Sequence, residues 1–254
     1  MRNPFTTLLV ISTFMLSAAL SGPALSEDTK SAPVDIENSE GMKKLKAMSD
    51  FLKSAKSMSF IVNSFYDEPS DDGLTIKRFV SHQIFLQHPD RLLFKAEFDD
   101  GTLRVGSFDG EKLTIALPAQ KSYTEVPVSG SIDKMIDILH DEYDISLPIT
   151  DFLYSDIYAA QKEFIETADY VGPRQFFGQT FDQIVLSGPT AVWQLWIASD
   201  NPLPTRFIAK YFREPGDPEY MATFLDWQID SVTVGDLVLE IPSDWKQVEL
   251  GAKE

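Results

Sequence analysis

Apolar and polar residues alternate with a period of two over most of the chain, which predicts β-strands joined by short turns. In the segment 193–199 this alternation places Trp193 and Ile197 on one face and Trp196 on the other. Asp200-Asn201-Pro202 then supplies a turn. The pattern predicts that the two tryptophans lie on opposite faces of one strand, one buried and the other partly exposed or under a helix.

Two runs of such strands are predicted, each with short turns between successive members. Asp109-Gly110 is the clearest hairpin signal, and Asp67 to Gly73 has the composition of a turn. Short turns between successive strands indicate antiparallel meanders. The predicted strands are 58–66, 74–87, 91–98, 102–108, 112–117, 122–126, 170–176, 181–186, 192–199, 206–212, 220–229 and 237–241.

Three segments instead repeat apolar residues every three or four positions, as helices do. They are 39–55, 132–143 and 151–166, with Ser39 and Ser131 as expected N-caps of the first two. The lysines of the first helix suit a solvated face or, alternatively, a membrane contact. Amphipathic helices this short need tertiary packing. The pattern therefore predicts one α+β domain in which helices pack on a sheet of about a dozen strands.

The N-terminal 26 residues have the organisation of a cleavable export signal. Arg2 precedes an apolar core that runs from Phe5 to Leu20, and Ala24-Leu25-Ser26 is a small-x-small ending. A membrane anchor is the alternative, but the core is short and Gly22-Pro23 follows it. We expect cleavage after Ser26, a flexible lead-in over 27–38 and a single domain over 39–254.

Composition narrows the function classes. The chain has no cysteine, so disulfides and thiolate sites are excluded. Its formal net charge of −17 repels nucleic acid and anionic membrane surfaces. Outside the N-terminal segment, no stretch is apolar enough over a sufficient length to cross a bilayer. A nucleic-acid partner and an integral membrane protein are therefore not expected.

Motifs for catalysis or cofactor binding are not found. His82 and His88 have no acidic partner at the spacing of metal ligands, so a structural or surface role is expected for them. His140-Asp141-Glu142 lies at a helix end, where a histidine suits the negative pole of the helix. The sequence contains no G-x-S-x-G elbow, P-loop or dinucleotide fingerprint. No catalytic residue, metal or cofactor is predicted, and we do not expect an enzyme.

The order and spacing of several short segments resemble a known family. They are His88-Pro89-Asp90-Arg91, Asp109-Gly110, Tyr123, Pro148 to Leu153, Tyr170-Val171-Gly172 with Gly178, Trp193 to Ile197 and Pro202-Leu203-Pro204. In these segments the chain resembles a bacterial family of predicted periplasmic proteins of unknown function (DUF2092). That family is similar to the LolA/LolB-like outer-membrane lipoprotein carriers and receptors.

The resemblance implies a LolA-like domain: a half-open antiparallel barrel whose concave side is covered by helices. It implies an exported, soluble periplasmic protein that binds lipid or lipoprotein acyl chains in a cavity between sheet and helices. The alternative is an envelope interaction or stress-sensing module, with an envelope protein partner, a filled core and no ligand. The residues expected to line a cavity are Phe60, Phe94, Ile132, Met135, Ile136, Leu139, Leu153, Trp193 and Trp196.

The helix 132–143 is the segment expected to cover such a cavity. Its flanks, Ser129-Gly130 and Pro148, are suited to act as hinges. If the helix opens, it is a lid over a ligand. If it does not, it is a permanent plug of the core.

Overall fold

The computed structural model describes residues 36–70, 74–145, 147–176, 178–233 and 237–250. The predicted signal 1–26, most of the predicted lead-in and the turn residues 71–73 lie outside these ranges. Ile36–Asn38, expected to be flexible, form a 3-10 turn (η1). No helix in the described ranges combines the length and apolar character needed to span a membrane.

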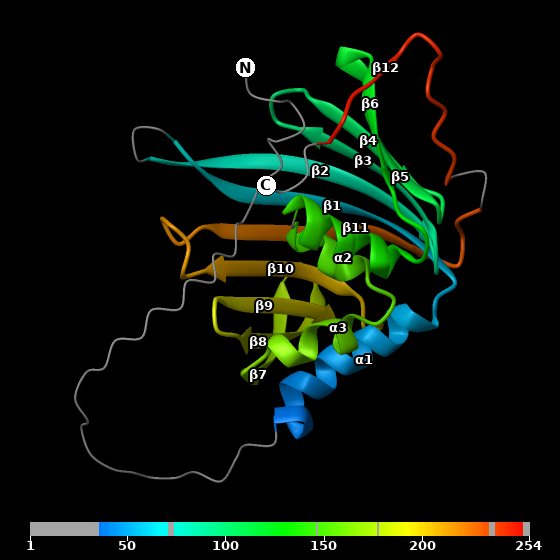
Figure 1. The fold of residues 1–254 in the computed structure, drawn as a ribbon. Coiled ribbons are helices and arrows are strands. Elements are labelled where there is room, and N and C mark those ends of the chain that lie inside the picture. The colour runs from blue at the N-terminus through cyan, green and yellow to red at the C-terminus, as the bar shows by residue number, and fades with distance from the viewer. Residues whose placement is uncertain (1–35, 71–73, 146, 177, 234–236, 251–254) are drawn as a thin grey trace.

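One open, curved sheet of twelve strands dominates the fold, as the predicted α+β class requires (Figure 1). Its order is β12-β6-β5-β4-β3-β2-β1-β11-β10-β9-β8-β7, so the two meanders join where β1 pairs with β11. All pairings are antiparallel except that of β12 with β6. The strands are β1 (Ser57–Pro69), β2 (Thr75–Gln87), β3 (Arg91–Phe98), β4 (Leu103–Phe108), β5 (Lys112–Leu117), β6 (Ser122–Pro127), β7 (Thr167–Phe176), β8 (Gln179–Ser187), β9 (Ala191–Ala198), β10 (Pro204–Tyr211), β11 (Glu219–Ile229) and β12 (Lys246–Gln247).

The helices lie together on the concave side of the sheet (Figure 1). Ser39 and Ser131 cap the first two as predicted, because their side chains accept hydrogen bonds from the backbone N–H groups of Met42 and Lys134. The first helix packs on β7 and β8. The helical elements are α1 (Glu40–Ser54), α2 (Ile132–Tyr143), α3 (Ile157–Gln161) and the 3-10 turns η2 (Pro118–Gln120), η3 (Pro148–Leu153) and η4 (Lys162–Phe164).

The predicted single helix 151–166 is wrong. The chain there forms η3, α3 and η4 as separate short pieces. Tyr154 leaves the helical region with ψ of 141°, and Asp156 then caps a new helix by accepting from the N–H of Ala159. A local cap and a turn therefore divide a segment whose apolar spacing alone resembles one helix.

The predicted strand 237–241 is also wrong. The described residues of this segment form no strand, and the last strand is instead β12, parallel to β6. The preceding strand β11 has β1 on one side and β10 on the other, so no edge is free beside it. The chain must cross to the edge at β6, and residues 237–241 belong to that crossing (Figure 1).

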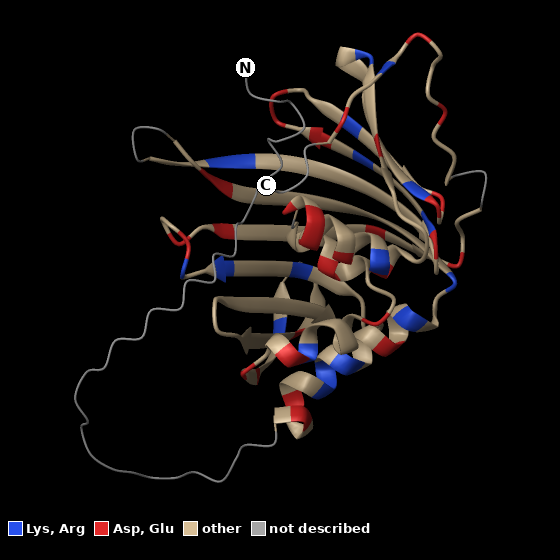
Figure 2. Ribbon diagram, in the orientation of Figure 1, with Lys and Arg blue, Asp and Glu red and all other residues tan. Residues whose placement is uncertain are grey.

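The lysines of α1 are paired with carboxylates. Lys44 and Lys53 reach Asp182 and Asp156 at 2.8 and 2.7 Å. Pairs within the helix region join Lys43 to Glu40 and Lys46 to Asp50. Lysine and carboxylate positions both occur along this helix (Figure 2), and their pairing favours the solvated alternative.

Candidate functional site: an apolar cavity beneath α2

A cavity of about 130 Å³ lies between the concave face of the sheet and α2. Strands β1 to β5 and β11 contribute its floor. Its cover, called the roof below, consists of α2 with residues 145 and 147–153. The lining residues are Tyr66, Val80, His82, Ile84, Leu92, Phe94, Ala96, Phe98, Arg104, Leu113, Ile115, Met135, Ile136, Leu139, Ile145, Leu147, Pro148, Ile149, Thr150, Leu153 and Tyr220.

The floor is built from cross-strand rows of inward-facing residues. One row runs from Ile84 through Phe94 and Gly106 to Ile115 on four neighbouring strands. A Cβ added at Gly106 would lie 2.2 Å from ring atoms of Phe94, so the ring lies directly over this glycine. The absence of a side chain at Gly106 therefore determines how deep the floor lies at this point.

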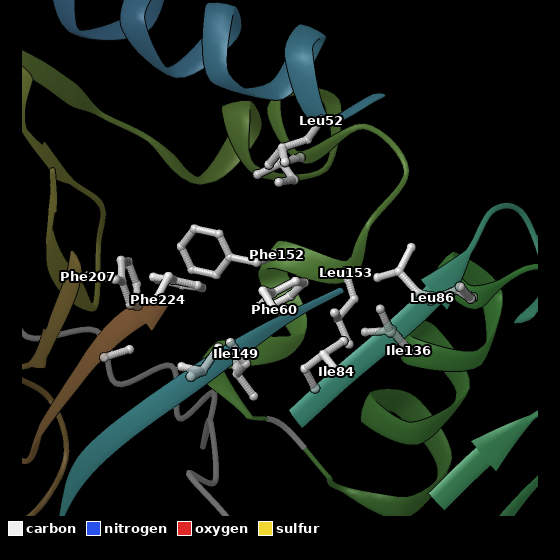
Figure 3. Close-up of a cluster of buried hydrophobic side chains, with 14 of the residues drawn as sticks. Leu52, Phe60, Ile84, Leu86, Ile136, Ile149, Phe152, Leu153, Phe207 and Phe224 are labelled. Atoms are coloured by element: carbon white, nitrogen blue, oxygen red, sulfur yellow. The ribbon is translucent and has the colours of Figure 1, made fainter. Parts of the chain in front are cut away.

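The roof presents one helix stripe and one 3-10 turn to the floor. Met135, Ile136 and Leu139 follow at spacings of one and three on α2, and all three are buried. Ile136 and Leu153 point toward Ile84 of β2 (Figure 3). The apolar spacing that predicted an amphipathic helix is thus the spacing that closes the cavity.

Backbone hydrogen bonds attach the roof to the rest of the molecule at its start. The N–H of Ile132 donates to the carbonyl oxygen of Pro89 at 2.8 Å, and that of Gly130 to the carbonyl oxygen of Gly110 at 3.0 Å. Farther along, the ring of Phe152 packs against Phe207 and Phe224, with ring centroids 5.1 and 4.7 Å apart. Asp133 of α2 accepts from the backbone N–H of Ser155, just beyond the roof, at 2.8 Å. Tyr154 donates its hydroxyl to Asp137, also at 2.8 Å. These bonds join α2 to the segment that follows it as one unit.

One end of the cavity is polar. His82, Ala96 and Arg104 form a single cross-strand row on the floor, and His82 and Arg104 are each only 8% exposed. The Arg104 guanidinium lies 4.6 Å from the ring centroid of Phe98. Burial lowers the pKa of His82 to about 4 and also lowers the pKa of Arg104.

The sequence pattern did not single out Arg104. For His82 it offered only metal binding or a structural or surface role. The available signal was strand parity: Arg104 shares its face with Gly106 and Phe108, so a charged residue stands on an apolar face. Over the residues that the structure describes, no three His, Cys, Asp or Glu side chains come together as a metal site would require.

Five of the nine candidate residues line the cavity beneath α2: Phe94, Met135, Ile136, Leu139 and Leu153. The other four lie elsewhere. Phe60 is buried in the core and stacks on Trp227 with ring centroids 4.1 Å apart, and Ile132 is fully buried at the start of α2. Trp193 and Trp196 are both in strand β9.

The two tryptophans do lie on opposite faces of β9. Trp193 is opposite Leu186 and Ala209, on the core side, whereas Trp196 is opposite Gln183 and Arg206. One of them was expected to be buried and the other partly exposed or under a helix, but both are half-buried. Trp193 borders a second cavity of about 40 Å³ beside α1, and that space leaves part of its ring uncovered.

Comparisons with known proteins confirm the resemblance seen in the sequence. The family model described as "Predicted periplasmic protein (DUF2092)" matches residues 41–251. No curated protein matches the chain.

Solved structures with a similar arrangement include an uncharacterized conserved protein from Thermus thermophilus, at 12% identity and a TM-score of 0.48 over 82% of this chain and 98% of its own. The lipoprotein LppX from Mycobacterium tuberculosis has 15% identity and a TM-score of 0.48, over 76% and 97%. A LolA superfamily protein from Nitrosomonas europaea has 9% identity and a TM-score of 0.34, over 78% and 97%. None of these likenesses identifies a ligand of this chain.

Proposed function

We infer, since the chain belongs to the DUF2092 family of predicted periplasmic proteins, that it is exported by means of its segment 1–26 and binds an apolar ligand. The ligand class we propose is a lipid or lipoprotein acyl chain. The observation that supports this proposal is the cavity beneath α2, whose walls are formed almost entirely by aliphatic and aromatic side chains. Burial of a chain there removes apolar surface from water on all sides.

Binding of a whole acyl chain in this cavity would require that the roof move. A cavity of roughly 150 Å³ accepts benzene, and pockets for larger ligands measure about 300–1,000 Å³. At about 130 Å³, the closed cavity holds only part of an acyl chain. We propose that α2 and the segment bonded to it swing away together. Gly130, with φ of +140°, stands at the start of this unit and is suited to be the hinge.

The same small volume is the observation that favours the alternative. In an envelope interaction or stress-sensing module, α2 would remain a permanent plug and the remaining space would be a packing defect. A partner protein would then bind elsewhere on the molecule. The two functions differ in one measurable property, which is whether the protein takes up an apolar probe.

We propose binding rather than catalysis for this cavity. Among its lining residues, the hydroxyl of Thr150 donates to the carbonyl oxygen of Leu147. The Nδ1 atom of His82 has no hydrogen-bond partner among the described residues. A nucleophile activated by a neighbouring base, which acyl transfer requires, is therefore not formed by these groups.

Uptake of the neutral dye N-phenylnaphthylamine by the purified protein tests the proposal. Ala96 is buried in the floor, so Ala96→Leu should fill part of the cavity and weaken dye binding at least tenfold. Lys95→Leu is the matched control, because Lys95 is the adjacent exposed residue on the other face of β3. Dye uptake that is absent in the wild type, or equal in Ala96→Leu at unchanged melting temperature, would contradict the proposal.

Export is tested separately, by N-terminal sequencing of the protein recovered from the periplasm of an expressing bacterium. We expect the mature chain to begin at Glu27, directly after Ala24-Leu25-Ser26. A mature protein that still begins at Met1 would contradict this part of the proposal.

A further inference from the structure

The polar end of the cavity contains a cation in an otherwise apolar wall. Arg104 and His82 lie two strands apart, on either side of Ala96, so about 9–10 Å separates their backbones. Because Ala96 carries only a methyl group, the two larger side chains face a common space above it. Tyr66 and Phe98 also line this end.

The surroundings both destabilise and compensate the Arg104 charge. Burial has the largest effect on its pKa and lowers it, while the nearby Tyr66 and Asp100 act in the opposite direction. Asp100 itself is 57% exposed and lies within 4.0 Å of Arg78, on the rim of the sheet. A buried guanidinium is costly unless an anion lies against it. An anionic group inside the cavity would add to that compensation.

His82 provides a second, independent sign of a ligand. It is 8% exposed, it lines the same end of the cavity, and its buried Nδ1 atom has no hydrogen-bond partner among the described residues. Buried polar atoms are normally hydrogen-bonded, so an isolated one calls for an explanation. A neutral imidazole has one N–H donor and one acceptor nitrogen, and an oxygen atom of a ligand in this space could accept from it.

We infer that the ligand is a single-chain amphiphile with a monoanionic head group, of which a carboxylate is the smallest. The head group lies between Arg104 and His82, and the tail extends along Ile84 and Phe94 beneath α2. Arg104 donates two parallel N–H bonds to a carboxylate in the geometry that guanidinium groups favour. This inference rests on the proposed function, and it adds the charge and the orientation of the ligand.

The number of charges and the size of the cavity argue for one chain and one negative charge. Arg104 is the cationic residue among the lining residues, since burial keeps His82 neutral. A dianion would bring two negative charges to a wall that includes one cationic side chain. The small volume holds only part of one aliphatic chain before the roof opens, and two or three chains would need a much larger displacement.

Binding of dodecanoate and of its methyl ester, measured by calorimetry, tests the inference. We expect the wild type to bind dodecanoate at least tenfold more tightly than the ester. Arg104→Met should abolish this preference and still bind the ester, whereas Arg104→Lys should retain part of it. Equal binding of both compounds by the wild type, or a preference that survives in Arg104→Met, would overturn the inference. Failure to bind either compound would instead overturn the proposed function.

Inorganic phosphate and acetate distinguish a free anion from an amphiphile. We expect neither to bind at millimolar concentration, because the tail supplies most of the affinity. Tight binding of either anion that depends on Arg104 would mean a site for free anions and would overturn the inference. Tighter binding of dodecyl phosphate than of dodecanoate would overturn the assignment to one negative charge.

A measurement on the wild type alone covers the case in which Arg104→Met does not fold. The carboxyl pKa of bound dodecanoate, labelled with ¹³C at C1, is obtained from its chemical shift as a function of pH. A guanidinium beside the carboxylate should lower this pKa below that of the free acid. A raised pKa would place the carboxyl in apolar surroundings, away from Arg104, and would overturn the inference.

Discussion

Gly106 and Phe94 show how single residues determine the cavity. The ring of Phe94 occupies the space that a side chain at position 106 would fill. Gly106 is not needed here for backbone freedom, because its φ is not positive. Its role is to let an aromatic ring lie flat on the floor, so the volume above the ring stays open.

Gly106→Ala should therefore reduce the cavity. The new methyl group pushes the Phe94 ring toward the roof, and overpacking of this kind costs about 1–3 kcal/mol of stability. We expect weaker uptake of N-phenylnaphthylamine together with a lower urea midpoint. Ser107→Ala is the matched control, because its side chain is on the opposite face of β4. Unchanged dye affinity in Gly106→Ala would mean that Phe94 does not limit the cavity.

His82 should make the stability of the protein depend on pH. Burial lowers its pKa to about 4 in the folded state, against about 6.5 in the unfolded state, so the unfolded chain binds more protons between these values. Its contribution is complete above pH 6.5 and is lost as the pH falls toward 4. Between pH 7 and pH 5 this amounts to roughly 2 kcal/mol.

Urea denaturation at pH 7 and pH 5 measures this contribution. We expect His82→Leu to lose distinctly less stability than the wild type over this interval. His140→Leu, a substitution of an exposed histidine on α2, should behave as the wild type does. Other acidic and basic groups are common to the three proteins and cancel in the comparison. Equal slopes for His82→Leu and the wild type would show that His82 is protonated normally in the folded protein.

Apolar periodicity correctly predicted those helices and strands whose limits are set by the local sequence. The limits of α2 and its Ser131 cap agree with the prediction, because stripe and cap are encoded within the same residues. The first six strands also agree, since the turns between them are signalled locally, except that β1 continues through Pro69 where a turn was predicted from Asp67. The segments 151–166 and 237–241 were predicted wrongly. Their structure depends on a competing cap at Asp156 and on which sheet edge is free.

In the candidate site too, the residues set by local sequence were predicted and those set by strand pairing were not. The roof residues Met135, Ile136 and Leu139 were predicted because a helix stripe must face the core. The polar row of His82, Ala96 and Arg104 was not, because it exists only once three strands are aligned in register. Strand parity shows that Arg104 faces inward, but long basic side chains on such positions often reach solvent, so parity alone did not reveal a buried charge.

The mobility of α2 can be tested through Leu139, which is 8% exposed and lines the cavity. Leu139→Asp places a carboxylate on the inner face of the roof. If α2 is a lid, we expect the circular dichroism spectrum to persist while probe uptake falls at least tenfold. His140→Asp is the matched control, since it introduces the same group on the exposed face of the same helix.

A plug would behave differently. In that case the buried carboxylate of Leu139→Asp has no open state in which it can reach water, and the domain should unfold. Loss of the circular dichroism signal together with uptake would therefore support the filled-core alternative.

The whole molecule and the proposed ligand both carry a negative net charge. The formal net charge is −17, and the negative residues are distributed over the surface (Figure 2). An anionic amphiphile is thus repelled at long range and attracted only close to Arg104. Long-range fields mainly affect association rates, whereas the buried contact mainly affects dissociation.

This separation predicts an unusual response to salt. Raising the ionic strength from about 0.01 to 0.15 M shortens the Debye length from about 30 to 8 Å, which screens the surface repulsion but not a buried contact. We expect the association rate of dodecanoate, followed by stopped flow at concentrations well below micelle formation, to rise roughly threefold, with little change in dissociation. The methyl ester, which carries no charge, should show no such increase and serves as the control. An association rate of dodecanoate that falls with salt would mean that a local positive field attracts the ligand from a distance, contrary to the charge distribution of the protein.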